Sequence, residues 1–154
     1  MRIWVAGDED VAAVTRLMIA FRDWWKRDSP GDDAFAAGVD RLLDDPATEF
    51  LLAAPPGRPA AGLCQLRYRY GLWYDAPDCW LEDLYVEDGA RRLGIGRALS
   101  DAALDRARRR GCRRVQLDVN EANPQALALY RSMGFDSLQD PPGGKLLLLT
   151  RWID

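Results

Sequence analysis

The chain has 154 residues, of which 48% are hydrophobic and 29% are charged, and its formal net charge at pH 7 is −3. This length suits a single domain over residues 1–154, and the acidic balance argues against a general nucleic-acid binder. The sequence has no histidine and three widely spaced cysteines, so we expect no metal site, and proton transfer near neutral pH must use a carboxylate, tyrosine, cysteine, lysine or water.

The N-terminal part of the chain predicts one strand and two helices. Residues 2–6 form the strand, and apolar residues recur at helical spacing over residues 11–26, with Asp8 as the expected N-cap. A proline-glycine break at residues 29–31 ends this pattern. A second helix is therefore expected over residues 33–44.

Three strands are predicted in the middle of the chain. Residues 49–54 and 61–70 flank a proline-rich stretch typical of a hairpin turn, and residues 78–86 form the third strand. Several aromatic residues near the second hairpin are expected to pack in the core or at a dimer contact, and they could also hold a cation: Tyr68, Tyr70, Trp73, Tyr74 and Trp80.

The C-terminal part predicts a long helix over residues 94–110, which a glycine ends, and a strand over residues 113–119. Another helix is expected to start at Asn123-Pro124, because proline fits the first helical turn. The apolar residues 145–152 predict a last strand. This order of elements indicates an α/β protein with one mixed sheet and helices on both faces.

The junction between the strand at 78–86 and the helix at 94–110 carries the clearest chemical signal. Gly94 and Gly96 leave the backbone open, and the helix start presents unpaired N–H groups at the positive end of its dipole. Such a turn binds phosphate. Neighbouring arginines add planar donors that match phosphate oxygens: Arg91, Arg92 and Arg97.

Two common phosphate-binding patterns are excluded at this junction. A Walker loop requires a lysine directly after its second glycine, and none follows here. A dinucleotide-binding fingerprint requires a third small residue where Leu99 stands. The junction therefore belongs to another class of phosphate site.

The apolar strand is followed by Arg91-x-x-Gly94-x-Gly96, and farther along by Asn123, Ala126, Tyr130 and Gly134-Phe135. This set resembles the GNAT superfamily of acyl-CoA-dependent N-acetyltransferases, and the resemblance spans residues 81–135. Residues 68–86 look, more loosely, like the diamine and polyamine acetyltransferase branch, which is commonly dimeric.

The resemblance implies a GNAT-like, mostly antiparallel sheet in which the strands before and after the long helix splay apart, with acetyl-CoA in the wedge. Pantetheine amides would pair with the backbone of Leu84, Tyr85 and Val86 as an added strand would. The remaining implied cofactor contacts are Arg91, Arg92, Leu93, Gly94, Ile95, Gly96, Arg97 and Asn123. An N-cap role would explain Asn123 equally well.

A primary amine has a pKa of about 10.4 and must lose a proton before it attacks a thioester. The resemblance favours Glu82 as the base, alone or through water, and Asp83 as a carboxylate that contacts the substrate or as the base instead. Neighbouring strand residues point to opposite faces, so both acids can serve one site only if a bulge or the splay disturbs the alternation. The alternative is a pair of solvated carboxylates.

The departing thiolate needs a proton, and a phenol with a pKa near 10 is matched to a thiol near 8.5. Tyr130 lies seven residues after Asn123, where the resemblance places the acid tyrosine. Without the resemblance, Tyr130 would be interpreted as a core aromatic residue of an amphipathic helix.

The resemblance implies direct transfer of an acetyl group from acetyl-CoA to a primary amine in a ternary complex. An acid-rich loop containing Asp28, Asp32 and Asp33 favours a small cationic amine such as a polyamine or diamine. Alternative acceptors are a protein N-terminus, an amino acid and an aminoglycoside. A non-catalytic acyl-CoA-binding regulatory module, or a structural domain with a chance glycine loop, would not need the two acids and the tyrosine.

The sequence also suggests where the protein acts. No apolar run approaches the roughly 20 residues of a membrane span, and an acid at position 8 precedes any export-type apolar region. We therefore expect a cytoplasmic protein that binds neither membrane nor nucleic acid and that forms a homodimer if it follows the resembled branch.

Overall fold

The computed structural model describes residues 1–137, 144 and 147–153. The chain divides into two compact units, Met1–Leu117 and Asp118–Asp154. Within the described residues, no helix is both long and apolar enough to cross a membrane.

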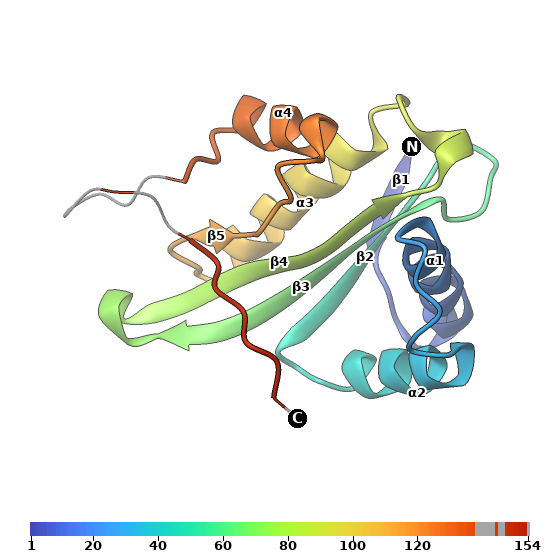
Figure 1. Cartoon of the computed structure of the whole chain (residues 1–154), viewed down its shortest axis with the longest axis horizontal. Helices are drawn as coiled ribbons and strands as arrows, with labels where there is room; N and C mark the ends of the chain where they lie inside the picture. The colour runs from blue at the N-terminus through green and yellow to red at the C-terminus, as the bar shows by residue number, and fades with distance from the viewer. Residues whose placement is uncertain (138–143, 145–146, 154) are drawn as a thin grey trace. The chain divides into compact units, whose positions relative to one another are not determined.

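The first unit is built on a sheet that has five strands in the described part of the chain (Figure 1). The strands lie in chain order across the sheet, and each pair is antiparallel except the last, which is parallel. Their bounds are β1 (Arg2–Val5), β2 (Thr48–Ala54), β3 (Gly62–Gly71), β4 (Ala76–Val86) and β5 (Val115–Gln116).

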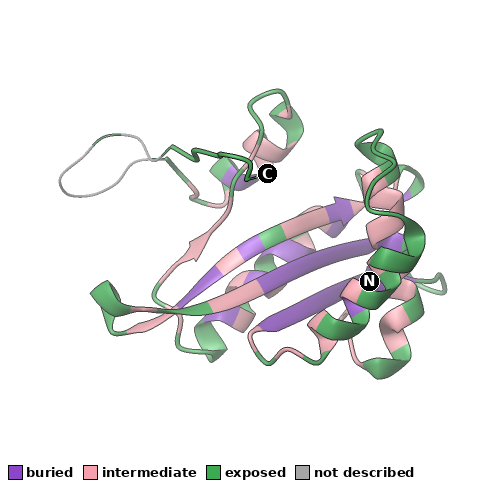
Figure 2. Cartoon of the chain, turned by 60° about the horizontal axis from the view of Figure 1, so that its bottom comes forward, coloured by how far each residue is buried: buried purple, intermediate pink, exposed green. Residues whose placement is uncertain are grey.

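Helices cover both faces of this sheet. α1 (Val11–Trp24) and α2 (Asp32–Leu43) bury Phe50, Leu52 and Leu63 on one face, and α3 (Ile95–Arg109) buries Leu51, Cys64 and Leu66 on the other. All seven residues of β2 are buried, because apolar side chains from both layers pack against it (Figure 2). The predicted mixed sheet with helices on both faces is confirmed.

The first helix starts differently from its prediction. Asp8 was expected as the N-cap, but it begins a 3-10 turn, and Asp10 directly precedes α1. The Asp10 carboxylate accepts hydrogen bonds from the Gly7 N–H at 3.1 Å and from Nε1 of Trp4 at 3.0 Å. Asp10 takes this place because it lies three residues after Gly7 and closes the turn onto β1.

A buried carboxylate fixes α3 against the sheet. Glu49 of β2 is 6% exposed and accepts hydrogen bonds from Nε of Arg106 at 2.9 Å, Nε of Arg110 at 3.0 Å and the Tyr68 hydroxyl at 2.9 Å. Burial by itself would raise the pKa of Glu49, but these hydrogen bonds together lower it below its ordinary value of 4.5. The network joins β2, β3 and α3.

The second unit contains α4 (Pro124–Ser132), which begins where it was predicted. Asn123 is its N-cap, and Oδ1 of Asn123 accepts a hydrogen bond from the Ala126 N–H at 3.1 Å. Near the other end of α4, the rings of Tyr130 and Phe135 meet edge to face with centroids 5.7 Å apart.

Two predicted strands are corrected. The strand predicted over residues 113–119 has only the two residues of β5, because the chain leaves β4 after Gln116. Residues 147–152 form no strand, and Leu149 is 86% exposed, since apolar residues become a strand only when a neighbour supplies hydrogen bonds. Positions 145 and 146 of this predicted strand lie outside the described residues.

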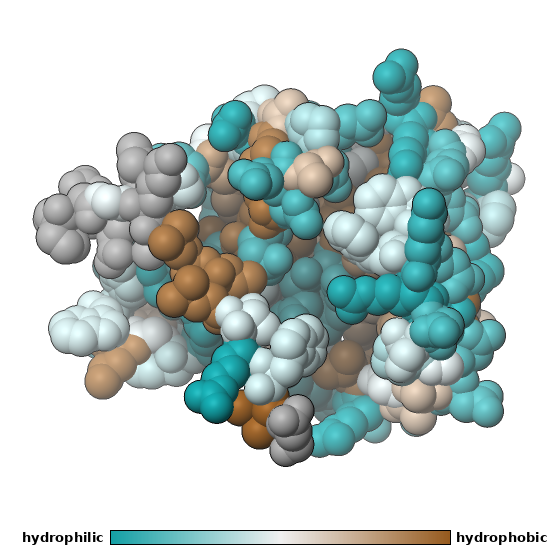
Figure 3. All heavy atoms as spheres, in the orientation of Figure 1, coloured by the Kyte–Doolittle hydropathy of each residue, from teal (hydrophilic) through white to brown (hydrophobic). Residues whose placement is uncertain are grey.

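Apolar side chains also reach the surface at the β3–β4 hairpin tip. A 3-10 turn, Leu72–Tyr74, joins the two strands there. Trp73 is 95% exposed and Tyr70 is 63% exposed, so core packing is wrong for these two residues. Figure 3 shows a patch of brown, hydrophobic spheres on the face it draws, whereas tryptophan and tyrosine are drawn pale because their hydropathy is intermediate. A dimer contact at the tip stays a prediction.

Candidate active site

The strand β4 contains a bulge at Glu82. Leu81 pairs with Leu66 of β3 and Asp83 pairs with Gln65, so Glu82 is an extra residue that faces no partner in the ladder. An extra residue in one strand changes which face the following side chains occupy. β4 therefore contains the break in alternation that two neighbouring acids need if both are to serve one site.

Packing on the two faces of the sheet shows the effect of the bulge. Leu81 lies in the core under α3, and beyond the bulge Leu84 and Val86 pack against the same core, whereas Tyr85 lies in the core under α1. Strict alternation from Leu81 would have placed Tyr85 under α3. Asp83, two residues before Tyr85, thus lies on the α1 face, while Glu82 is exposed.

Next to the bulge, β4 and β5 separate. β5 pairs with β4 only at Cys79 and Trp80. Among the residues that the structure describes, the outer edge of β4 has no ladder partner over residues 81–86. The predicted splay is confirmed, and an open strand edge presents backbone donors and acceptors to a ligand.

An ion pair between a buried aspartate and a half-buried arginine marks the point where the separation begins. Nη2 of Arg114, just before β5, donates to Oδ2 of Asp78 in β4 at 2.8 Å, and Asp78 is 3% exposed. Backbone bonds of 3.1 Å connect the Arg113 N–H to the Pro77 carbonyl and the Cys79 N–H to the Arg114 carbonyl. The closed end of the wedge is thus fixed by both side chains and backbone.

The glycine loop leads from the open edge of β4 into α3. Gly94 is the N-cap of α3 with φ of +79°, a left-handed conformation that disfavours a residue with a side chain. The Ala98 N–H makes the first intrahelical bond, to the Gly94 carbonyl at 3.0 Å. The N–H groups of Ile95 and Gly96 come before any intrahelical acceptor and can bind an anion.

The other predicted residues of this loop differ in their surroundings. Arg91 donates from Nε to the Val86 carbonyl at 3.0 Å. Arg92, Leu93 and Arg97 are exposed. The side chain of Ile95 is buried in the α3 core, so only its backbone can reach a ligand. The loop therefore offers backbone N–H groups and guanidinium groups at one end of the open strand edge.

Asn123 and Tyr130 both belong to the second unit. They are seven residues apart on α4, and two helical turns place them on the same side of that helix. The Asn123 side-chain oxygen caps the helix, which fits the structural interpretation given for it. Tyr130 is 8% exposed.

The structure places one further polar residue beside Asp83 and changes the charge expected of the acid-rich loop. Gln65, 4% exposed and directly across from Asp83, was missed, because only the paired register brings it there. The acid-rich loop is less negative than expected, since Nη1 of Arg22 donates to Oδ1 of Asp32 at 2.7 Å. Hydrogen bonds to Asp23 and Asp32 raise the pKa of Arg22.

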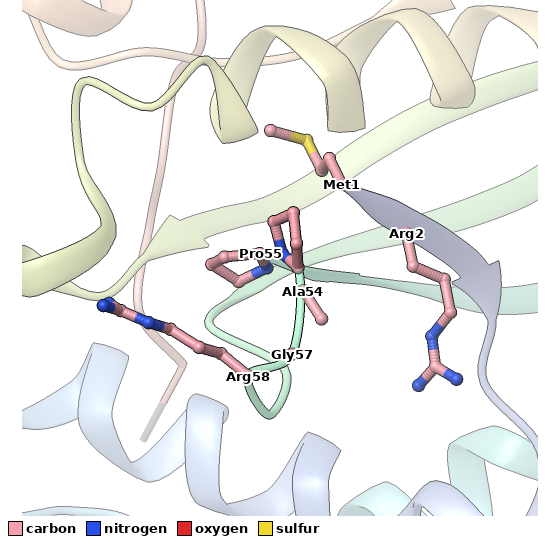
Figure 4. A pocket seen from close by; sticks show the side chains of 7 residues that line it. Met1, Arg2, Ala54, Pro55, Gly57 and Arg58 are labelled. Carbon is pink, nitrogen blue, oxygen red and sulfur yellow. The ribbon is translucent and has the colours of Figure 1, made fainter.

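A separate cavity of about 410 Å³ lies beside the β2–β3 turn (Figure 4). Arg2 and Arg58 line it together with the turn, and their side chains extend in different directions. The two guanidinium groups therefore do not converge on one anion, and the glycine loop is the better phosphate site.

The chemistry open to this site is limited. Among the described residues, no cluster of cysteine, aspartate and glutamate could hold a metal ion. Cys64 and Cys79 are buried, while Cys112 is only partly buried. Burial raises the pKa of the Cys79 thiol to about 12, so it stays protonated at neutral pH. The Cys79 thiol is therefore a poor base at neutral pH.

Comparison with known proteins gives a consistent result. A sequence model of the acetyltransferase (GNAT) family matches residues 15–135. The thialysine N-epsilon-acetyltransferase of Bos taurus is 32% identical over 148 residues, which are 90% of this chain and 85% of that protein. The crystal structure of an acetyltransferase homologue from Arthrobacter sp. FB24 is 28% identical, covers 99% of this chain and 96% of that one, and has a TM-score of 0.87.

A further relative matches over a shorter segment. The mycothiol acetyltransferase of Beutenbergia cavernae is 45% identical over 67 residues, which are 42% of this chain. The match spans 23% of that protein's length.

Proposed function

The chain belongs to the acetyltransferase (GNAT) family of acyl-CoA-dependent N-acetyltransferases, and from that premise we propose that it transfers an acetyl group from acetyl-CoA to a small cationic primary amine. The observation that carries the proposal is the open edge of β4, with a bulge at Glu82 before it and the Gly94 turn after it. We take residues 1–154 as one catalytic domain, because the family match crosses the boundary between the two units.

Acetyl-CoA is proposed to lie along the open edge. The backbone of Leu84, Tyr85 and Val86 pairs with the pantetheine amides as a neighbouring strand would. The N-terminal turn of α3 and its arginines hold the diphosphate, since the helix dipole and the N–H groups both favour an anion. The diphosphate contacts come from Arg91, Arg92, Leu93, Gly94, Ile95, Gly96 and Arg97, and Asn123 adds a further cofactor contact.

The amine attacks the thioester carbonyl carbon directly. Glu82, alone or through one water, accepts the proton that the ammonium group must lose before attack. Its exposed position at the bulge supports this role, because the incoming amine arrives from solvent. Asp83, on the α1 face, is proposed to attract and orient the cationic amine.

As the new C–N bond forms, the C–S bond to coenzyme A breaks and leaves a thiolate. Tyr130 donates its phenolic proton to that sulfur, since the two groups have similar pKa values. The chemical balance is one acetyl group moved to nitrogen and one thiol released. Glu82 returns its proton to solvent, and Tyr130 recovers one.

A small cationic acceptor is supported by two observations. The Bos taurus relative, 32% identical over most of this chain, is named a thialysine N-epsilon-acetyltransferase, and we propose an amine acceptor for this chain as well. Glu82 and Asp83 place two carboxylates in neighbouring positions of β4, which favours a positive ligand. A diamine or polyamine fits this pair.

An acceptor screen tests the function. The purified chain is mixed with acetyl-CoA and single amines, including a diamine, a polyamine, a lysine analogue, an aminoglycoside and a peptide with a free N-terminus, and thiol release is measured. We expect release above the amine-free rate with the diamine, polyamine or lysine analogue. Binding of acetyl-CoA with no acceptor-dependent release by any amine would favour a regulatory binding module instead.

We also propose a cytoplasmic location and a homodimer. The absence of a membrane-crossing helix among the described residues is compatible with the location, and the apolar hairpin tip with 95% exposed Trp73 is a possible contact surface. Light scattering after gel filtration gives the mass in solution. A monomer at all concentrations would exclude the dimer.

A further inference from the structure

A column of aromatic rings runs from β4 to the end of α1. The ring of Tyr85 stacks on Phe21 with centroids 5.2 Å apart and planes at 27°. Phe21 in turn stacks on Trp24 at 6.2 Å and 28°. These near-parallel rings belong to two elements, so the column fixes the last turn of α1 against the strand that carries the open edge.

Arg91 of the glycine loop closes the end of this column. Its guanidinium carbon lies 5.3 Å from the centroid of a Trp24 ring, within the range of a cation–π contact. Its Nε donates to the Val86 carbonyl at 3.0 Å, and Nη2 lies 2.9 Å from Oδ1 of Asp88. Three contacts from α1, β4 and the loop thus restrain one flexible side chain.

The three contacts have different effects on an arriving anion. The Asp88 carboxylate neutralises part of the charge of Arg91 and competes with a phosphate for its N–H groups. The indole of Trp24 contacts the guanidinium without using any N–H donor, because the attraction comes from the ring face. Two of the five guanidinium N–H groups are engaged by Val86 and Asp88, which leaves donors for a ligand.

We propose that Trp24 is a positioning residue for Arg91, which it holds in place for the diphosphate of the cofactor. This inference rests on the proposed function, in which Arg91 binds that diphosphate. An arginine that is already restrained loses less side-chain freedom when it binds, so the indole increases affinity without touching the cofactor. The acid-rich loop begins directly after Trp24. Trp24 therefore contacts the glycine loop through Arg91 and also precedes the acid-rich loop.

The first test compares three single variants by calorimetric titration with CoA. Trp24→Leu removes the ring face and is expected to weaken CoA binding about two- to fivefold, the effect of one cation–π contact. Trp24→Phe keeps a ring and is expected to restore most of the affinity. Trp25→Leu is the matched control, because Trp25 is 45% exposed against 39% for Trp24 and also contacts Phe21.

The second test asks whether the effect passes through Arg91. In an Arg91→Gln background, Trp24→Leu is expected to cause no further loss of CoA affinity, because the partner of the ring is gone. S-acetylpantetheine, which lacks the diphosphate, is expected to show the same KM with Trp24→Leu as with the unchanged chain. Thermal unfolding of each variant shows whether it is folded.

The results distinguish failure of the positioning role of Trp24 from failure of the proposed acetyltransferase function. Equal CoA affinity of Trp24→Leu and the unchanged chain, or an equal loss in Trp25→Leu, overturns the positioning role while the proposed function stands. A loss that persists in the Arg91→Gln background, or with S-acetylpantetheine, overturns it as well. If the unchanged chain binds no CoA, the proposed function itself is wrong.

Discussion

Glu82 is the residue that we propose as the base. It is exposed and occupies the extra position of the bulge, so it can meet an amine from solvent without being part of the packed core. Asp83, one residue later, lies on the α1 face with the buried Gln65 across from it. The two acids therefore have different surroundings.

Removing the charge of Glu82 tests its role as the base. Glu82→Gln is expected to lower kcat/KM for the amine by about 100-fold near pH 6 and by less at pH 9, because free amine is scarcest at low pH. The measurement is the pH profile of thiol release for both proteins. A loss that is equal at every pH would point to substrate binding and not to proton removal.

Tyr130 is the second residue whose proposed role a single substitution can test. Tyr130→Phe keeps the ring that packs against Phe135 and removes only the hydroxyl. We expect kcat to fall by about 100-fold while the dissociation constant of CoA stays the same, since the hydroxyl acts on the departing sulfur. Steady-state kinetics and calorimetry check the two parts, and unchanged turnover would remove Tyr130 from the mechanism.

At the scale of elements, Glu49 couples the sheet to α3, the helix whose N-terminal turn is proposed to bind the diphosphate. The carboxylate is buried between Arg106 and Arg110 of the α3 end and Tyr68 of β3. The position of the Gly94 turn therefore depends on a contact at the far end of the same helix. A change at Glu49 is expected to act on folding first.

Glu49→Gln is expected to lower the free energy of unfolding at pH 7 by about 2–3 kcal/mol, because two arginines lose a charged acceptor. The folded-state pKa of Glu49 lies below its ordinary value of 4.5, so the ionised carboxylate stabilises the protein above that value. This stabilisation is lost as the pH falls through the folded-state pKa.

Urea unfolding at pH 7 and at pH 3.5 measures this effect. The difference between Glu49→Gln and the unchanged chain is expected to shrink at the lower pH. Asp105→Asn, which removes an exposed ion pair with Arg108, is the control and is expected to change stability by less than about 1 kcal/mol at either pH. An undiminished difference at pH 3.5 would contradict the lowered pKa.

The elements differ in how far the sequence predicted them. Helices α1, α2 and α3 and strands β1 to β4 follow from apolar periodicity, because each buries one face or both. The bulge at Glu82 does not, since it exists only in the pairing of β4 with β3. β5 is shorter than predicted, and residues 147–152, the described part of the strand predicted over 145–152, form no strand. In both places a strand extends only where a neighbour supplies hydrogen bonds.

At the scale of the whole molecule, ligand binding must stabilise the folded state by mass action. Acetyl-CoA at 100 times its dissociation constant is expected to add about 2.7 kcal/mol, which for a chain of this size raises Tm by roughly 5–10 °C. Thermal unfolding with and without acetyl-CoA measures the shift, and ADP is the control for weak phosphate binding. If saturating acetyl-CoA does not raise Tm, the glycine turn is a structural feature and not a phosphate site.

The sequence predicted the local part of the candidate site but not the contacts that depend on strand register and helix packing. The loop from Arg91 to Gly96 is local, so its glycine and arginine pattern could be interpreted from the sequence. Gln65 reaches its position through strand register and Trp24 through helix packing, so neither contact follows from the local sequence. Residues 24 and 91 are far apart along the chain, and only the folded α1 brings them together.

The ion pair of Asp78 and Arg114 fixes the closed end of the wedge, and the Gly94 turn stands beyond its open end. Between them, residues 81–86 of β4 cover about 20 Å at the usual rise of a strand. In the proposed complex the length of this strand segment selects acyl donors of matching length. A donor with a shorter chain between its thioester and its diphosphate can reach either the two acids or the N-terminus of α3, but not both at the same time.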